Sequence, residues 1–203
     1  MKVSSEIEIC NLALIRIEQS TIASMDDKSV QAQTCKAMYE QAKSSLLARY
    51  NWSFAIKKAK LAQIDNSADP LKEYTYMYSL PADFLRVFMV YNDAKLPIIQ
   101  QPNGKPSYAI EGQNLLTDEP TCIIKYVSDE KIVSKFSPLF VNCLVLDMAV
   151  RLTRIFQSSS AYQQQLMAEY QMELANAKIC DCQQTPFYHH EVSPLFNRYW
   201  NSI

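Results

Sequence analysis

The chain of 203 residues carries a formal net charge of −1, with 48% hydrophobic and 20% charged residues. Its length suffices to bury a core without disulfides or metals, and its charge gives no strong attraction to nucleic acid or anionic membranes. It has only two glycines, which excludes a P-loop and a dinucleotide-binding fingerprint, because both motifs need a glycine-rich turn.

The amino-terminal residues lack the long apolar stretch of a secretory leader, and no apolar run reaches the roughly 18 residues of a membrane span. Six cysteines are spread over the chain. Cys10, Cys35 and Cys143 fall within apolar helical patterns, where free cysteine behaves as a small hydrophobe. We therefore expect a soluble protein with reduced cysteines and no membrane partner.

Two helices are predicted first. Ser5 and Glu8 have the spacing of a capping box. Cys10 and Leu14 then continue an apolar face at helical spacing, which predicts a helix buried on most sides. A second helix is predicted over residues 29–50, after the capping residues of the stretch MDDKS.

Residues 53–129 follow a different pattern. The stretches YTYMYSLP and RVFMVYN are rich in aromatic and β-branched side chains, which favour strands. Prolines, the pair Asn103–Gly104 and Gly112 interrupt the region at short intervals, as in hairpins. The pattern predicts a small antiparallel β domain.

Helical signals return at Ser137 and Pro138, which suit an N-cap and a first helical position. The following stretch LFVNCLVLDMAVRLTRIF is apolar nearly all round and predicts a central buried helix. Three serines at 158–160 end it and begin a fourth helix.

The predicted fold class is α+β: a four-helix bundle with an antiparallel β domain inserted between the second and third helices, plus an extended C-terminal arm. The expected boundaries are 1–52 and 130–182 for the two halves of the bundle, 53–129 for the β domain and 183–203 for the arm.

Three charged residues interrupt the most apolar helix. Asp147, Arg151 and Arg154 are spaced i, i+4 and i+7 and therefore share one side of it. One interpretation is an ion pair within one chain, on a solvent-exposed side of the helix. The three residues fit equally well a set of ion pairs between subunits, which would fix the register of an assembly.

Motifs for metal binding or catalysis are weak. Cys180 and Cys182 precede His189 and His190, but zinc knuckles place two or more residues between their sulfurs. Adjacent carboxylates occur at predicted turns or helix starts, where acids cap or bend the chain: Asp26–Asp27, Asp118–Glu119 and Asp129–Glu130. We predict no catalytic residue, no metal and no cofactor.

The last 19 residues, 185–203, show neither a helical nor a strand period, yet they hold five aromatic residues. A chain end without a partner is usually polar and frayed, so we expect this one to be covered. It either folds back over its own domain or docks on a partner as a linear segment, stiffened by prolines. The predicted docking arm comprises Phe187, Tyr188, Phe196, Arg198, Tyr199 and Trp200.

Four motifs occur in a fixed order along the first half of the chain. They are Asn-x-Ala-Leu at 11–14, Asp-Asp-x-Ser at 26–29, Leu-Leu-x-x-x-x-Trp-x-Phe-Ala at 46–55 and Tyr-x-Leu-Pro-x-Asp at 78–83. Together they resemble the tail tubular protein A family of short-tailed bacteriophages, which are head-to-tail adaptors beneath the portal. The resemblance is densest over residues 7–91. In one departure, Glu18 and Gln19 stand where the family's first helix usually stops at a glycine.

The resemblance implies a structural protein without bond chemistry, located in the virion neck after assembly in the host cytoplasm. It implies a ring of twelve copies between the portal protein and the tail nozzle protein, with double-stranded DNA passing through without sequence-specific binding. The C-terminal arm would contact the portal or a neighbouring subunit. Two alternatives stay open: a tail-associated glycan hydrolase, which needs a carboxylate pair in a cleft, and another neck component, such as a head-completion or tail-terminator protein.

Overall fold

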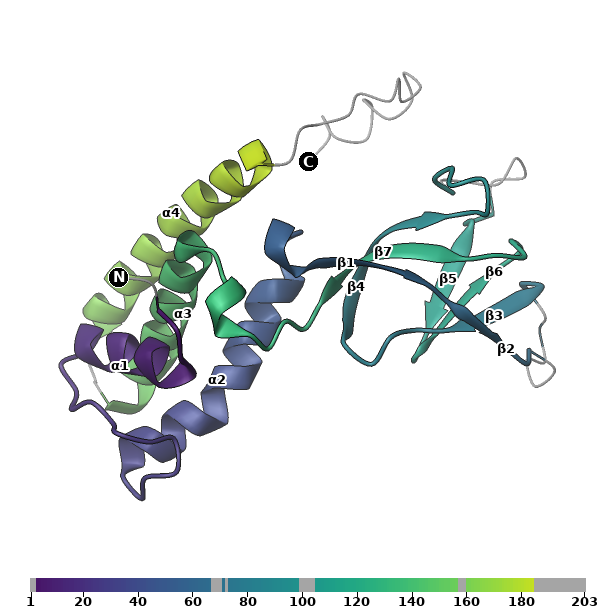
Figure 1. Cartoon of the computed structure of the whole chain (residues 1–203). Helices are drawn as coiled ribbons and strands as arrows, with labels where there is room; N and C mark the ends of the chain where they lie inside the picture. Colours follow the sequence, from purple (N-terminus) through teal and green to yellow (C-terminus); the bar gives the residue numbers. More distant parts are fainter. Residues whose placement is uncertain (1–2, 67–70, 72, 99–104, 157–159, 185–203) are drawn as a thin grey trace.

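A computed structural model describes residues 3–66, 71, 73–98, 105–156 and 160–184 (Figure 1). Helices lie at both ends of this described part and strands lie in its middle. Figure 1 shows the strands projecting from one side of the helices, so the β region is attached to the helical part through one end.

Among the four α-helices of the described residues, the third is central. α3 buries twelve of its nineteen residues and packs against each of the other three helices, most extensively against α4. A helix that is apolar on nearly all sides needs neighbours all round. The helices are α1 (Glu6–Arg16), α2 (Val30–Ala48), α3 (Pro138–Phe156) and α4 (Ser160–Gln184), with short 3₁₀ turns η1 (Ser53–Ala55) and η2 (Val133–Lys135).

The strands form two antiparallel sheets. One has the order β1-β7-β4 and the other the order β2-β3-β6-β5. Only Leu61 separates β1 from β2, so one extended stretch of chain serves both sheets. The strands are β1 (Ile56–Lys60), β2 (Ala62–Ile64), β3 (Tyr76–Ser79), β4 (Phe84–Tyr91), β5 (Tyr108–Glu111), β6 (Asn114–Thr117) and β7 (Ile123–Ser128).

Side-chain caps fix the helix starts. The amide of Glu8 donates to the Ser5 hydroxyl, while the Glu8 carboxylate accepts from the amide of Ser4 at 2.7 Å, one residue before the expected partner. Ser29 and Ser137 cap α2 and α3 in the same way. These starts were predictable because a cap bonds only to backbone three residues away.

The buried side chains form two cores. The larger one lies among the helices and also includes Ala55 and Val127 from the base of the β region. The smaller one lies between the two sheets and includes Tyr78, Leu115 and Ile124. Because Val127 and Ile124 come from the same strand, β7 contributes to both cores and holds the two parts of the molecule together.

The predicted fold class, an α+β four-helix bundle with one inserted β domain and an extended C-terminal arm, is wrong. The helices gather around α3 instead of forming a regular bundle, and their lengths differ from eleven residues in α1 to twenty-five in α4. The strands divide between two sheets, and residues 185–203 of the arm lie outside the described residues. A helical period shows which face is buried but not which element covers it.

The turn after α1 closes without a glycine, as the sequence indicates, but it still uses a left-handed residue. Glu18 has a φ of 57°. The Glu18 amide donates to the carbonyl of Ile15, and the Gln19 amide donates to that of Leu14. This is the hydrogen-bond pattern of a Schellman motif, in which the left-handed position is normally glycine because a Cβ atom is strained there.

We expect Glu18→Gly to stabilise the protein by about 1 kcal/mol, because glycine removes the strain of a left-handed residue. Urea denaturation measures the change. Glu18→Ala is the matched control and should change stability by no more than about 0.5 kcal/mol, since alanine retains the Cβ atom. Equal stabilisation by both substitutions would show that the gain comes from removing the negative charge and not from relieving backbone strain.

Candidate functional site: the junction of helices and sheets

The predicted docking-arm residues Phe187, Tyr188, Phe196, Arg198, Tyr199 and Trp200 lie outside the described residues. Gln184, the last residue of α4, directly precedes this part of the chain. The surroundings of the last turns of α4 therefore determine where residues 185–203 begin.

Asp181 joins the end of α4 to the start of the β region. Its side chain is buried and accepts hydrogen bonds from the Ser53 amide at 3.0 Å and from the Ser53 hydroxyl at 2.8 Å. Nearby, the Tyr50 hydroxyl donates to the carbonyl of Lys178 and lies 2.6 Å from Sγ of Cys182. Burial and Cys182 raise the pKa of Tyr50, so its hydroxyl stays protonated and can donate.

An aromatic cluster fills the space beneath this junction. Trp52 is fully buried, and its indole N–H donates to the carbonyl of Leu46 at 3.0 Å. The Phe140 ring meets Trp52 and Phe54 edge-on, with centroids 5.1 and 5.0 Å apart, an arrangement that aromatic quadrupoles favour. Phe136 packs against the same Phe140 ring. The base of the β region is thus packed rigidly on the start of α3.

The structure brings two of the three predicted inter-subunit charges together within one chain. Nε of Arg151 donates to the nearly buried Asp147 carboxylate at 2.9 Å. Arg49, the residue after α2, donates to the hydroxyl of Tyr170 on α4, whose pKa is raised by burial and by Asp147. Arg154 is exposed at the end of α3. An inter-subunit role for these charges stays a prediction, and the position of Arg154 suits it best.

A second polar cluster, around Asp83, joins β1, β7 and the start of β4 near the junction. Asp83 accepts from Lys57 at 2.7 Å and from the Tyr126 hydroxyl at 3.0 Å. Burial by itself would raise the pKa of Asp83, but these hydrogen bonds outweigh it and hold the pKa below its ordinary value of 3.8. Burial and the bond to Asp83 raise the pKa of Tyr126 to about 12. The cluster is therefore charged and bonded at neutral pH.

The carboxylates considered for catalysis are engaged in structural contacts. Asp118 accepts from the amide and hydroxyl of Thr75, both at 2.9 Å, and forms an ion pair with Lys105 at 3.0 Å. Asp129 forms an ion pair with Lys43 at 3.4 Å. Within the described ranges, no group of three or more His, Cys, Asp and Glu side chains is arranged to hold a metal ion.

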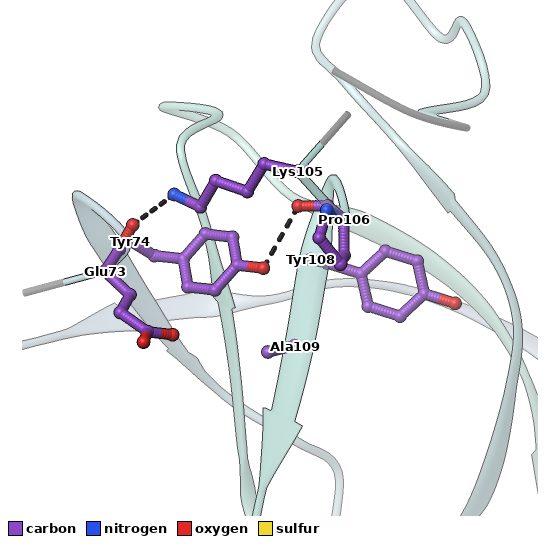
Figure 2. A pocket seen from close by; sticks show the side chains of 6 residues that line it. All are labelled: Glu73, Tyr74, Lys105, Pro106, Tyr108 and Ala109. Atoms are coloured by element: carbon purple, nitrogen blue, oxygen red, sulfur yellow. Dashed lines mark hydrogen bonds between the residues drawn. The ribbon is translucent and has the colours of Figure 1, made fainter. Parts of the chain in front are cut away.

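Figure 2 shows a hollow in the β region, lined by Glu73, Tyr74, Lys105, Pro106, Tyr108 and Ala109. Its volume is about 640 Å³, and it is wide open to solvent. The Lys105 ammonium lies 3.8 Å from the centre of the Tyr74 ring and donates to the carbonyl of Glu73, while the Tyr74 hydroxyl donates to Pro106. These polar groups bond to one another and brace the loop, so the hollow does not resemble a ligand site with convergent free groups.

Sequence reasoning missed the junction, because Asp181 and Ser53 are 128 residues apart. One signal was present: a carboxylate in the last turns of a helix is disfavoured by the helix dipole unless another interaction compensates. Asp181 occupies such a position, and Ser53 supplies the compensation.

We expect Asp181→Ala to cost about 1–3 kcal/mol, because it leaves the partly buried amide and hydroxyl of Ser53 without their acceptor. Urea denaturation gives the free energy, and hydrogen exchange at η1 localises the loss. The exposed neighbour Cys180 provides the control: Cys180→Ala should stay within about 0.5 kcal/mol of the parent. If the Asp181→Ala variant has the same free energy of unfolding as the parent, the junction does not depend on this carboxylate.

The Asp83 cluster predicts a pH dependence. A depressed carboxyl pKa stabilises the fold above the unfolded-state pKa, and this stabilisation disappears as the pH falls through the folded-state value. The stability difference between the parent and Asp83→Asn should therefore be largest at neutral pH, decline as the pH falls below about 3.8, and vanish once the pH is below the lowered folded-state pKa. Urea titrations across this range measure it, with Asp93→Asn, an exposed carboxylate, as the control. A difference that stays constant with pH would contradict the proposed ionisation.

None of the described helices is both long and apolar enough to cross a bilayer. The sequence was also compared with known proteins. No protein-family model matches it, and no curated protein matches it. The candidate site accordingly rests on the geometry of the junction and on the motifs of the sequence.

Proposed function

We propose that this protein is a structural head-to-tail adaptor, or connector, of a bacteriophage virion. In this role, copies form a ring between the portal and the tail nozzle, with twelve subunits as the resemblance implies. The ring assembles in the host cytoplasm and stays in the virion neck, where DNA passes through it. The protein works by symmetric association and partner recognition, without an enzymatic reaction.

The observation that carries the proposal is that each of the four motifs contains a residue whose side chain makes specific hydrogen bonds within the fold. The Asn11 side chain both donates to and accepts from the main chain of Ile22, at 2.9 and 2.8 Å. Asp27 accepts from two amides in the same loop. Trp52 bonds within the junction, and Asp83 links two strands. Ordinary apolar patterning would not require these residue types at these spacings.

Surface features also favour a protein that associates with others. Large apolar side chains are exposed on all four α-helices of the described residues: Leu12 and Ile15 on α1, Val30 on α2, Ile155 on α3, and Met167, Met172 and Ile179 on α4. Such side chains supply the apolar area that subunit contacts use. A ring needs heterologous contacts, made by two different surfaces of each subunit, whose rotation closes the ring.

The charge of the chain suits a channel wall. A basic bore would hold DNA by releasing counterions from its phosphates, whereas a chain of net charge −1 has no overall positive charge with which to hold DNA. The C-terminal arm completes the proposal: residues 185–203 start at the end of α4, which Asp181 anchors, and their aromatic side chains and Arg198 are of the kinds that dominate interface energies.

Native mass spectrometry with purified portal tests the proposal. We expect the full chain to bind the portal in ring stoichiometry and a truncation ending at Gln184 to lose that binding, because the arm supplies the anchoring side chains. Truncation leaves every described residue in place, so circular dichroism of the shortened chain serves as the folding control. Absence of binding by the full chain would overturn the adaptor function. Equal binding by both chains would keep the function and remove the role of the arm.

A further inference from the structure

Three lysines converge on one face of the three-stranded sheet. In the register of β1 and β7, Lys58 lies directly opposite Lys125, and Lys60 lies opposite Ile123. Residues directly opposite one another in an antiparallel pair point to the same face. Lys58, Lys60 and Lys125 therefore project together, while Lys57 points to the other face and pairs with Asp83.

This face lacks compensating negative charge. The residues of β4 that continue the same rows are Met89, opposite Lys125, and Tyr91, opposite Ile123. Among the described residues, Lys58, Lys60 and Lys125 have no ion pair with a carboxylate, and Lys125 instead lies 4.8 Å from the centre of the Phe88 ring. Burial and Lys58 lower the pKa of Lys125. Like charges directly opposite each other destabilise a sheet, so an anionic partner would relieve a cost built into this one.

The lysine face adjoins an open sheet edge. β1 is an outer strand, with β7 as its neighbour. The Leu61 amide donates to the carbonyl of Cys122, and hydrogen-bonded pairs alternate along an antiparallel ladder. Ala59 and Lys57 therefore bond to β7, whereas the main-chain groups of Lys58 and Lys60 point outward. Within the described part of the chain, these outward groups have no hydrogen-bond partner.

Lysines on an edge strand have a well-known protective role, because they repel a second copy of the same edge. That role accounts for Lys58 and Lys60, both exposed on β1. It does not account for Lys125, which lies on the central strand β7 and adds a third positive charge beside them. A group of three cations next to an unpaired edge both rejects a like edge and attracts an acidic strand.

We propose that the free edge of β1 binds an extended acidic segment of a partner protein, which adds to the sheet as a further strand. The main chain of the segment would bond to the outward groups of Lys58 and Lys60. Its carboxylates would face the three lysines, with Lys58 and Lys60 on the adjoining strand and Lys125 one strand further in. Main-chain bonds supply affinity in such strand addition, and alternate side chains supply specificity. The inference does not depend on the ring or on the portal.

An acidic strand fits this surface better than nucleic acid does. A phosphate backbone can accept hydrogen bonds from main-chain amides but has no donors for the outward carbonyls of a strand, whereas an extended peptide pairs with both. Nucleic-acid binding is therefore the competing outcome of the experiment.

The test uses a fluorescein-labelled peptide of about eight residues that alternates glutamate and threonine, so that its carboxylates lie on one face of a strand. Fluorescence anisotropy with the full-length protein measures its affinity. Two comparison peptides carry lysine in place of glutamate, or N-methyl groups on alternate amides that remove the main-chain donors. A DNA duplex of about 20 base pairs tests the competing ligand.

We expect the acidic peptide to bind and both comparison peptides to bind at least about tenfold more weakly, because one loses the charge match and the other the ladder bonds. The double variant K58E/K60E should weaken binding of the acidic peptide by about tenfold or more. The variant K28E/K131E changes net charge equally at exposed sites outside the strands and should bind as the parent does. Circular dichroism confirms that both variants fold.

Three results would overturn the proposal. One is equal binding of the N-methylated and unmodified acidic peptides, which would reduce the interaction to charge. Another is equal weakening by the two double variants, which would remove the assignment to β1. The third is tighter binding of the DNA duplex than of the acidic peptide, which would make the lysine face a phosphate-binding surface.

Discussion

The need to cover α3 on nearly every side determines the arrangement of the rest of the molecule. Twelve of its nineteen residues are buried, which a helix achieves only when neighbours surround it. α1, α2 and α4 supply those neighbours. The start of α3 contributes Phe140 to the aromatic cluster that holds the base of the β region. One helix thereby sets both the helical packing and the position of the sheets.

The junction shows how a few polar bonds complete a mainly apolar interface. Trp52 and Asp181 are both buried, and the polar group of each has a hydrogen-bond partner. The Trp52 indole donates to the carbonyl of Leu46, and the Asp181 carboxylate accepts from the amide and hydroxyl of Ser53. Buried polar groups with partners specify one geometry, because any other arrangement leaves them unsatisfied. The root of the β region and the start of residues 185–203 are consequently held together.

Much of the local structure was predictable. The caps at Ser5, Ser29 and Ser137 and the buried character of α3 follow from interactions within a few residues. The regular four-helix bundle was a wrong prediction, because packing partners are not encoded in a helical period. The junction was missed for a related reason: Asp181 meets Ser53 only after the β region has returned the chain to the helices.

The sequence by itself determined where helices and strands form and which faces they bury, since these depend on local spacing and capping. It also determined the motifs on which the proposed adaptor function depends. Only the tertiary structure decided that the strands divide between two sheets and that Lys58 lies opposite Lys125. Strand register joins residues that are far apart in the chain. A nearly neutral composition therefore conceals a local concentration of positive charge until the strands pair.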